Sequence, residues 1–374
     1  MSLDLHKLLN RNPVEVDLGH VEDQLSNSVV LITGAGGSIG SELARQILQM
    51  RPKKLLLLDH SEFNLYNIDL ELRELTSLSE IISILGDIKD KASLQAIFEK
   101  FRPQYIYHAA AYKHVHLVER NPFTAIINNV LGTKHLIDCA LNFGVNSFVM
   151  VSTDKAVNPI SVMGATKRVC EMLITHAAEK SGDRYCSVRF GNVLGSSGSL
   201  IPLLEKQILS GGPITITHPE MMRYFMLIEE AVRLVLKAGE ISSPGDVNIL
   251  KMGEPVKVVE MAKKVLQQFG KSEEDVPIVF TQVRPGEKLF EELYLIGDEA
   301  PTEHQDILVL PRKNISEESI EVIQRMIGLA LKKDEEALVL LKYLSADEPY
   351  SLVVNPRAGN SSVTMFRREL QAEG

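Results

Sequence analysis

The stretch Thr33-Gly34-Ala35-Gly36-Gly37-Ser38-Ile39-Gly40 decides the fold that we expect for this chain. It follows an apolar, β-branched run at 29–33 and precedes an amphipathic helical pattern over residues 39–48. Glycines at such a turn let the backbone bend tightly and approach a pyrophosphate, which then faces the N-terminal end of the helix. A lone glycine-rich turn can equally be merely structural, so the residues around it must support the interpretation.

Further apolar runs follow at 54–58, 81–85, 105–108 and 148–151, separated by helical stretches such as 122–143. Strands that alternate with helices at this spacing predict a parallel sheet with right-handed crossovers. Continuous apolar strands suit a sheet that is covered on both faces. The predicted fold class is therefore α/β, a Rossmann-type doubly wound parallel sheet with a smaller α/β C-terminal substrate lobe.

The pattern of glycines and prolines suggests four parts of the chain. Residues 1–26 form a polar, helix-like leader, and residues 27–192 the dinucleotide-binding domain, to which parts of 224–250 return. From 193 to 312 the chain is richer in loops and reads mainly as the substrate lobe, with helices at 229–239 and 256–269. Residues 313–374 read as a helical extension with helices at 317–331 and 334–344.

Composition narrows the function classes. The chain has 374 residues, 45% of them hydrophobic, and a net charge of −9, which argues against a nucleic-acid surface. Its three cysteines lack metal-ligand spacing, so we expect no metal site and a reducing cytoplasm. No apolar run is long enough to predict a membrane span, and no secretion signal opens the sequence.

Two acidic residues at strand ends point to the cofactor. Asp59 follows the second strand, 19 residues after Gly40, where a carboxylate can accept both adenosine ribose hydroxyls. Such a charge would repel a 2′-phosphate and favours NAD, although His60 and Ser61 leave NADP open. Asp87 and Ile88 follow the third strand and are expected at the adenine edge.

Six stretches together carry a family resemblance: 33–40, 108–115, 152–159, 163–167, 189–193 and 284–288. The chain resembles an extended short-chain dehydrogenase/reductase, and specifically the polysaccharide-biosynthesis UDP-N-acetylglucosamine 4,6-dehydratases. The resemblance implies an NAD-dependent enzyme, usually oligomeric, with Ala109 and Ala110 beside the cofactor. It is strongest to the soluble catalytic part of membrane-anchored members.

The resemblance also places the chemistry. Lys167 stands where the wider family has the lysine that bonds the nicotinamide ribose, but Met163 occupies the tyrosine position, and a thioether has no proton to exchange. Thr153 would then hold the C4 oxygen, Asp154 would be the C6 acid and Lys155 the C5 base. These last two roles need a protonated acid and a neutral amine, which a close Asp–Lys pair opposes.

The same resemblance implies the substrate contacts. Asn192, Arg223 and Arg284 would bind the pyrophosphate, Glu287 the uridine ribose, and Lys113 would edge the site. The alternatives are ordinary: isolated arginines and an Asp-Lys pair are often surface charges, Lys167 could be a solvated helix lysine, and His114 could be a structural histidine. Met163 could also mark a decayed, inactive enzyme.

Three functions remain in view. The first is NAD-dependent 4,6-dehydration of UDP-N-acetylglucosamine to a UDP-4-keto-6-deoxy sugar. The second is a nucleotide-sugar 4-epimerase, which shares the oxidation but needs no proton handling at C5 and C6. The third is a regulator that binds a dinucleotide without turnover. The Asp154-Lys155 pair favours the first.

Overall fold

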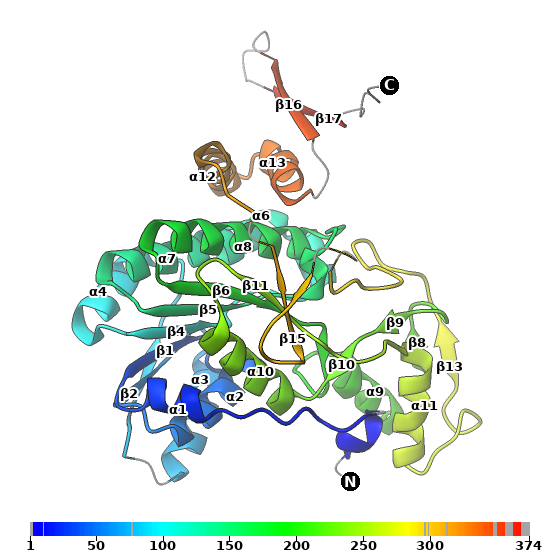
Figure 1. The fold of residues 1–374 in the computed structure, drawn as a ribbon. Coiled ribbons are helices and arrows are strands. Elements are labelled where there is room, and N and C mark those ends of the chain that lie inside the picture. Colours follow the sequence, from blue (N-terminus) through cyan, green and yellow to red (C-terminus); the bar gives the residue numbers. More distant parts are fainter. Residues whose placement is uncertain are drawn as a thin grey trace.

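The computed structural model describes residues 3–9, 11–75, 78–294, 297, 299–311 and 313–346, and the backbone of 350–355 and 362–367. Its centre is a nine-stranded sheet with the order β14-β15-β11-β6-β5-β4-β1-β2-β3 (Figure 1). The strands are β1 (Val29–Thr33), β2 (Lys54–Asp59), β3 (Glu80–Leu85), β4 (Tyr105–His108), β5 (Ser147–Val151), β6 (Arg184–Arg189), β11 (Val247–Leu250), β14 (Ala300–Pro301) and β15 (Ile307–Leu310). The seven strands from β3 to β11 run parallel, β15 pairs antiparallel with β11, and β14 pairs antiparallel with β15. The predicted α/β doubly wound sheet is confirmed.

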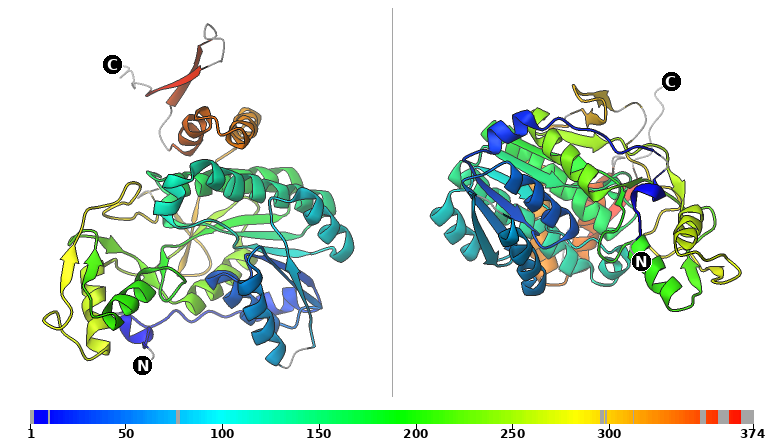
Figure 2. Two further views of the ribbon diagram at one scale, coloured as in Figure 1. Left: turned by 180° about the vertical axis from the view of Figure 1, so that it is seen from behind. Right: turned by 90° about the horizontal axis from the view of Figure 1, so that it is seen from below.

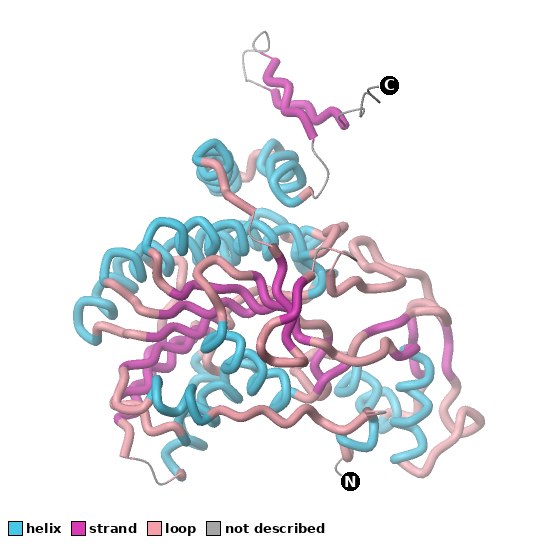
Figure 3. Tube along the Cα trace, in the orientation of Figure 1, coloured by secondary structure: helices cyan, strands magenta, loops and turns pink. Residues whose placement is uncertain are grey.

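Helices cover both faces of the sheet, as Figure 3 shows. One face packs against α4 (Lys91–Phe101), α7 (Gly132–Phe143) and α8 (Val162–Ser181), and the closing helices α12 (Glu317–Leu331) and α13 (Glu336–Ser345) complete the same core. The other packs against α1 (Gly19–Leu25), α2 (Ser38–Gln49), α3 (Glu62–Glu74) and α10 (Ile228–Ile241). Alternate residues of β1 enter the two cores, Leu31 the first and Ile32 the second, because strand side chains alternate between faces.

The helix expected over 122–143 is interrupted. It consists of α6 (Pro122–Ala125), a π-helical turn (Ile126–Leu131) and α7, preceded by the short α5 (Val115–Arg120). Asn129 of the π turn bonds the backbone of Tyr112 in both directions and donates to Thr166 Oγ1 at 3.0 Å. π turns of this kind often occur at functional sites.

The smaller lobe has its own apolar core. It contains α9 (Leu200–Leu209), β8 (Ile214–Ile216), α11 (Val258–Gln268) and β13 (Ile278–Phe280). Two separate two-stranded sheets also occur in this part of the chain: β7 (Asn192–Val193) with β10 (Phe225–Met226), and β9 (Met222–Arg223) with β12 (Val256–Lys257). The last pair means that the helix expected from 256 begins two residues later.

The leader differs from the expectation. Rather than a polar helix-like segment, it contains a 3-10 turn, η1 (His6–Leu8), an extended run and α1, and it crosses both lobes (Figure 2). Leu8 is buried in the core of the smaller lobe, and Val21 and Leu25 are buried beneath the sheet. Arg11 pairs with the buried carboxylate of Glu230 on α10. These partners lie far away in the sequence, so local pattern could not reveal them.

Two boundaries also differ. Residues 300–310, grouped with the substrate lobe, add β14 and β15 to the main sheet, because 307–310 form an apolar strand. The C-terminal extension contains the antiparallel strands β16 (Tyr350–Asn355) and β17 (Ser362–Arg367) after its two helices. Among the helices of the described ranges, none combines the length and the apolar character that a membrane crossing requires.

Candidate functional site

The glycine loop lies between β1 and α2 and has little room for side chains. Gly34 has a φ of +67°, and a Cβ there would lie 2.7 Å from the amide nitrogen of Ala110. A Cβ on Gly40 would lie 2.0 Å from the carbonyl oxygen of Gly34. Gly37 precedes α2 and no side chain caps the helix, so the amides of its first turn can face an anion. The loop therefore fits a pyrophosphate.

Asp59 at the end of β2 holds this loop in place. One carboxylate oxygen accepts from Gly36 N at 2.9 Å and the other from Ser61 N at 2.8 Å. Each oxygen keeps a second lone pair, so the ribose contact expected of Asp59 stays a prediction. A cavity of about 140 Å³ beside Asp59 is lined by predicted cofactor residues, namely Gly34, Gly37, Asp87, Ile88, Ala109 and Ala110.

A larger cavity of about 860 Å³ joins the glycine loop to the catalytic segment. The predicted residues that line it are Gly34, Gly37, Ser38, Ile39, Gly40, Ala109, Lys113, Thr153, Lys155, Met163, Lys167 and Asn192. The sheet register explains why these residues lie around one cavity. Thr33 pairs with both Leu58 and His108, so the neighbouring strands β1, β2 and β4 end at the same edge of the sheet. Ligands of open parallel sheets bind at this edge.

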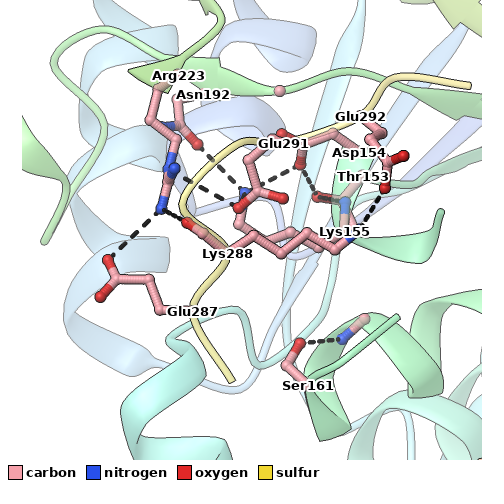
Figure 4. A network of polar contacts seen from close by, with 12 residues as sticks. Thr153, Asp154, Lys155, Ser161, Asn192, Arg223, Glu287, Lys288, Glu291 and Glu292 are labelled. Carbon is pink, nitrogen blue, oxygen red and sulfur yellow. Dashed lines mark hydrogen bonds and ion pairs between the residues drawn. The ribbon is translucent and has the colours of Figure 1, made fainter. Parts of the chain in front are cut away.

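The catalytic segment is a tight turn after β5, η3 (Asp154–Ala156). Thr153 Oγ1 donates to Asp154 Oδ1 at 2.8 Å, and Lys155 Nζ donates to the same oxygen at 2.9 Å (Figure 4). Asp154 is fully buried and stands behind Lys155 instead of facing the cavity. A Cβ on Gly191 would lie 3.2 Å from Asp154 Oδ2, so a small residue keeps this carboxylate in place.

The Asp154–Lys155 pair is not a surface pair. Burial lowers the pKa of Lys155, but the carboxylates of Asp154 and Glu291 outweigh burial and raise it above its usual value. The two carboxylates therefore favour the ammonium form of Lys155. The pairing opposes a neutral Lys155, as expected from the sequence, and the base role of Lys155 stays a prediction.

Met163 and Lys167 project from α8 into the same cavity. Met163 packs with Val118 and Ala125 in a small apolar cluster. Lys167 is only 5% exposed, and burial lowers its pKa, so it is not the solvated helix lysine that was the alternative. The apolar contacts of Met163 give it a packing role at the wall of the cavity.

Helix α8 touches the catalytic turn at Gly164. A Cβ there would lie 2.1 Å from the carbonyl oxygen of Lys155. This oxygen belongs to the backbone, so the clash can be relieved only if the turn itself moves. We expect Gly164→Ala to displace the turn and to reduce turnover on the order of 100-fold, since misplacement by about 1 Å can have that effect. Gly328→Ala on α12 is the matched control, because its Cβ would meet no atom within 4 Å. Steady-state rates equal in the two variants would contradict the prediction.

Of the residues expected to bind the substrate phosphates, Asn192 lines the large cavity, whereas Arg223 and Arg284 do not. Asn192 lies in the cavity and accepts from Lys155 Nζ at 3.4 Å. Arg223 is only 6% exposed, and its guanidinium donates to the carbonyl oxygens of Met222 and Lys288 at 2.7 and 2.8 Å. It therefore anchors the backbone of the 284–292 segment, instead of presenting a fork to the cavity. Its charge is directed to Glu287 and Glu291, at 3.6 and 3.8 Å.

Arg284 and Glu287 lie on that same segment, and neither contributes to the lining of the large cavity. Arg284 is exposed, and its backbone N–H donates to Glu287 Oε2 at 3.3 Å. Their expected roles at the uridine diphosphate stay predictions. Sequence reasoning missed Glu291, because Glu291 and Glu292 both stand between Phe290 and Leu293 and no local signal distinguishes them.

Three close approaches involve the loop at 196–198 beside the cavity. The backbone N–H of Ser197, in the smaller lobe, donates to Ser38 Oγ at 3.0 Å. Lys113 donates to Ser196 Oγ at 3.5 Å, and a Cβ on Gly198 would lie 2.6 Å from the ring of His114. His114 thus packs against the loop that closes over the glycine turn.

A buried ion pair supports β5 and β6 from behind. Arg189 donates to both oxygens of Glu171 at 2.7 and 2.6 Å, and Ser152 Oγ donates to Glu171 at 2.7 Å. Burial raises the pKa of Glu171, but Arg189 outweighs it, so this pKa lies below its usual range. The pair fixes the residue that precedes Thr153.

Known proteins resemble this chain over most of its length. A capsular polysaccharide biosynthesis protein (CapD) of Staphylococcus aureus is 50% identical over 293 residues, 78% of this chain and 49% of the relative. A UDP-glucose 4-epimerase of Rickettsia rickettsii is 34% identical over 71% of this chain and 77% of its own. The chain spans about half the length of the first of these relatives.

Among solved structures, the dTDP-glucose 4,6-dehydratase DesIV of Streptomyces venezuelae has a TM-score of 0.62 and 24% identity, over 71% of this chain and 87% of its own. That likeness concerns the fold. The family model described as polysaccharide biosynthesis protein matches residues 30–312. The match covers the glycine loop, the catalytic turn and the 284–292 segment, and the chain therefore belongs to this polysaccharide-biosynthesis family of extended short-chain dehydrogenases/reductases.

Proposed function

We propose that the chain catalyses the NAD-dependent 4,6-dehydration of UDP-N-acetylglucosamine. The observation that carries the proposal is the turn Thr153-Asp154-Lys155, in which a hydroxyl and an amine line the cavity that begins at the glycine loop and both donate to the buried carboxylate of Asp154. An epimerase needs no acid and base for C5 and C6, whereas a dehydratase needs both. The dehydratase DesIV, whose structure holds NAD, has the same fold.

Bound NAD would supply the hydride acceptor for C4 and the hydride donor for C6. The cradle for it is the glycine loop, whose close backbone approaches exclude side chains. Asp59 is the reason to prefer NAD, because a 2′-phosphate would meet its buried carboxylate. NADP stays the alternative, since His60 lines both cavities and lies 3.6 Å from that carboxylate.

The proton handling follows from the turn. Met163 cannot accept the C4 hydroxyl proton, so Thr153 relays it to Asp154, with which it is already hydrogen-bonded. Asp154 then passes the proton back through Thr153 Oγ1 to the hydroxyl that leaves C6, and water forms. Lys155 removes the C5 proton and returns one to C5 at the end. Lys167 would bond the nicotinamide ribose, as the family resemblance implies.

Incubation with UDP-N-acetylglucosamine in deuterated water tests the proposal. A dehydratase releases water and leaves one deuterium at C5, which mass spectrometry and NMR detect. A galacto product without deuterium would establish the 4-epimerase, which is favoured by the relative of that name. An unchanged sugar with bound dinucleotide would favour the sensing regulator.

A further inference from the structure

Glu291 is an acid in an unusual place. It belongs to the 284–292 segment, where its neighbours Phe290 and Glu292 are exposed, yet only 7% of Glu291 is exposed. Its Oε1 lies 3.5 Å from Lys155 Nζ and 3.8 Å from Arg223 Nε (Figure 4). Its Oε2 is buried and has no hydrogen-bond partner among the described residues.

An ionised carboxylate with an unsatisfied oxygen is unfavourable in such a position. The burial of Glu291 is not needed to hold the 284–292 segment in place. Arg223 already holds this segment through the carbonyl oxygens of Lys288 and Leu289. Glu287 stands closer to the same guanidinium, at 3.6 Å. What Glu291 adds is a second carboxylate beside Lys155.

We propose that Glu291 accepts the proton that Lys155 must lose before it can act as the C5 base. The inference rests on the proposed dehydration. The proton moves from Lys155 Nζ to a Glu291 oxygen, which converts an ammonium and a carboxylate into an amine and a carboxylic acid. The amine then takes the C5 proton and later returns it to C5. Glu291 finally gives its proton back to Lys155, so the cycle balances.

The charges around Glu291 support this role. Burial raises the pKa of Glu291, and the Asp154 carboxylate raises it further, while Lys155, Arg223 and Lys288 lower it. The balance lies on the raised side, as a proton acceptor for a lysine requires. Once Asp154 carries the C4 proton, Lys155 keeps Glu291 as its remaining carboxylate partner among the described residues. The proton transfer from Lys155 to Glu291 is then easiest after C4 oxidation, just before Lys155 removes the C5 proton.

Glu291 therefore does not contact the substrate in this proposal. It acts through Lys155, whose proton it accepts and later returns. The competing role is purely structural: its contact with Arg223 would keep the 284–292 segment closed over the substrate. The two roles differ in what they change. Loss of an anchor weakens substrate binding and raises KM, whereas loss of the proton acceptor slows a step after C4 oxidation and lowers kcat.

The test compares Glu291→Gln with Glu292→Gln. The second is a matched control because Glu292 is exposed and contacts Lys288 and Asn158, at 2.9 and 3.5 Å. We expect Glu291→Gln to lower kcat on the order of 100-fold with KM unchanged, as for the loss of an acid–base group. Reduced nicotinamide should accumulate during turnover, because C4 oxidation continues. Glu291→Asp, which keeps the carboxylate, should restore part of kcat.

The pH profile gives a second readout. In Glu291→Gln the proton of Lys155 must leave to solvent, so activity should rise with pH where the wild type is flat. Removal of the carboxylate also lowers the pKa of Lys155, but before C4 oxidation the ionised Asp154, at 2.9 Å, still holds the proton on the amine of Lys155. A higher KM with no reduced nicotinamide and an unshifted profile would overturn the inference. Wild-type protein that fails to dehydrate would instead remove the proposed function, and the inference with it.

Discussion

Lys155→Ala is expected to lower dehydration of UDP-N-acetylglucosamine about 10³-fold while the dinucleotide stays bound. The amine is the only base that the proposed mechanism offers to C5, and general bases contribute about 10²- to 10⁴-fold. The glycine loop is built from β1, β2 and α2, so the substitution leaves the cofactor cradle untouched. Product formation and the dinucleotide content of the purified protein measure the two halves of the prediction.

Lys155→Gln is the companion variant. Its amide can still donate to Asp154 Oδ1, which otherwise loses the partner at 2.9 Å and stays fully buried. Equal loss of activity in Lys155→Ala and Lys155→Gln would show that the missing base, and not a disturbed turn, causes the loss. Turnover within tenfold of the wild type in Lys155→Ala would remove Lys155 from the C5 role.

Arg189→Met is expected to destabilise the protein by at most about 3–5 kcal/mol, because the buried Glu171 carboxylate loses its bidentate partner and keeps only Arg168, at 3.2 Å, and Ser152. The pKa of Glu171 is depressed in the folded state. In the wild type this pair therefore stabilises the fold above the unfolded pKa of the carboxyl, and the contribution is lost as pH falls through the folded pKa. The loss in Arg189→Met should be largest near neutral pH and shrink in acid.

Denaturant unfolding across this pH range measures the effect. Arg233→Met on α10 is the matched control, since Arg233 is exposed and such substitutions usually change stability by less than about 0.5 kcal/mol. A difference between Arg189→Met and the wild type that does not depend on pH would contradict the explanation, because protonation of Glu171 removes the buried charge.

The sequence predicted the central sheet well because its evidence is local. The strands at 29–33 and 105–108 were placed residue for residue, since each is a short apolar run bounded by polar or turn residues. The helix at 317–331 was placed equally well. Thr153, Lys155, Lys167 and Asn192 were predicted as site residues, and they line one cavity because neighbouring strands end at the same sheet edge.

What the sequence could not predict depends on distant partners. Arg223 read as a free guanidinium, but its bonds to the backbone of residues 288 and 289 arise only when the smaller lobe folds. Glu291 turns inward between exposed neighbours, and no periodic pattern marks that turn. Arg11 and Glu230 are 219 positions apart, so the course of the leader could not be read from its own residues.

The contact between Ser197 and Ser38 has a consequence for the lifetime of the bound dinucleotide. It joins a loop of the smaller lobe to the turn that would hold the pyrophosphate, so we expect this loop to slow the departure of a dinucleotide. In the proposed dehydration the dinucleotide takes up a hydride and returns it within each turnover, so it does not have to be exchanged. We therefore expect exchange with dinucleotide in solution to be much slower than turnover, so that the purified protein retains its carrier through desalting.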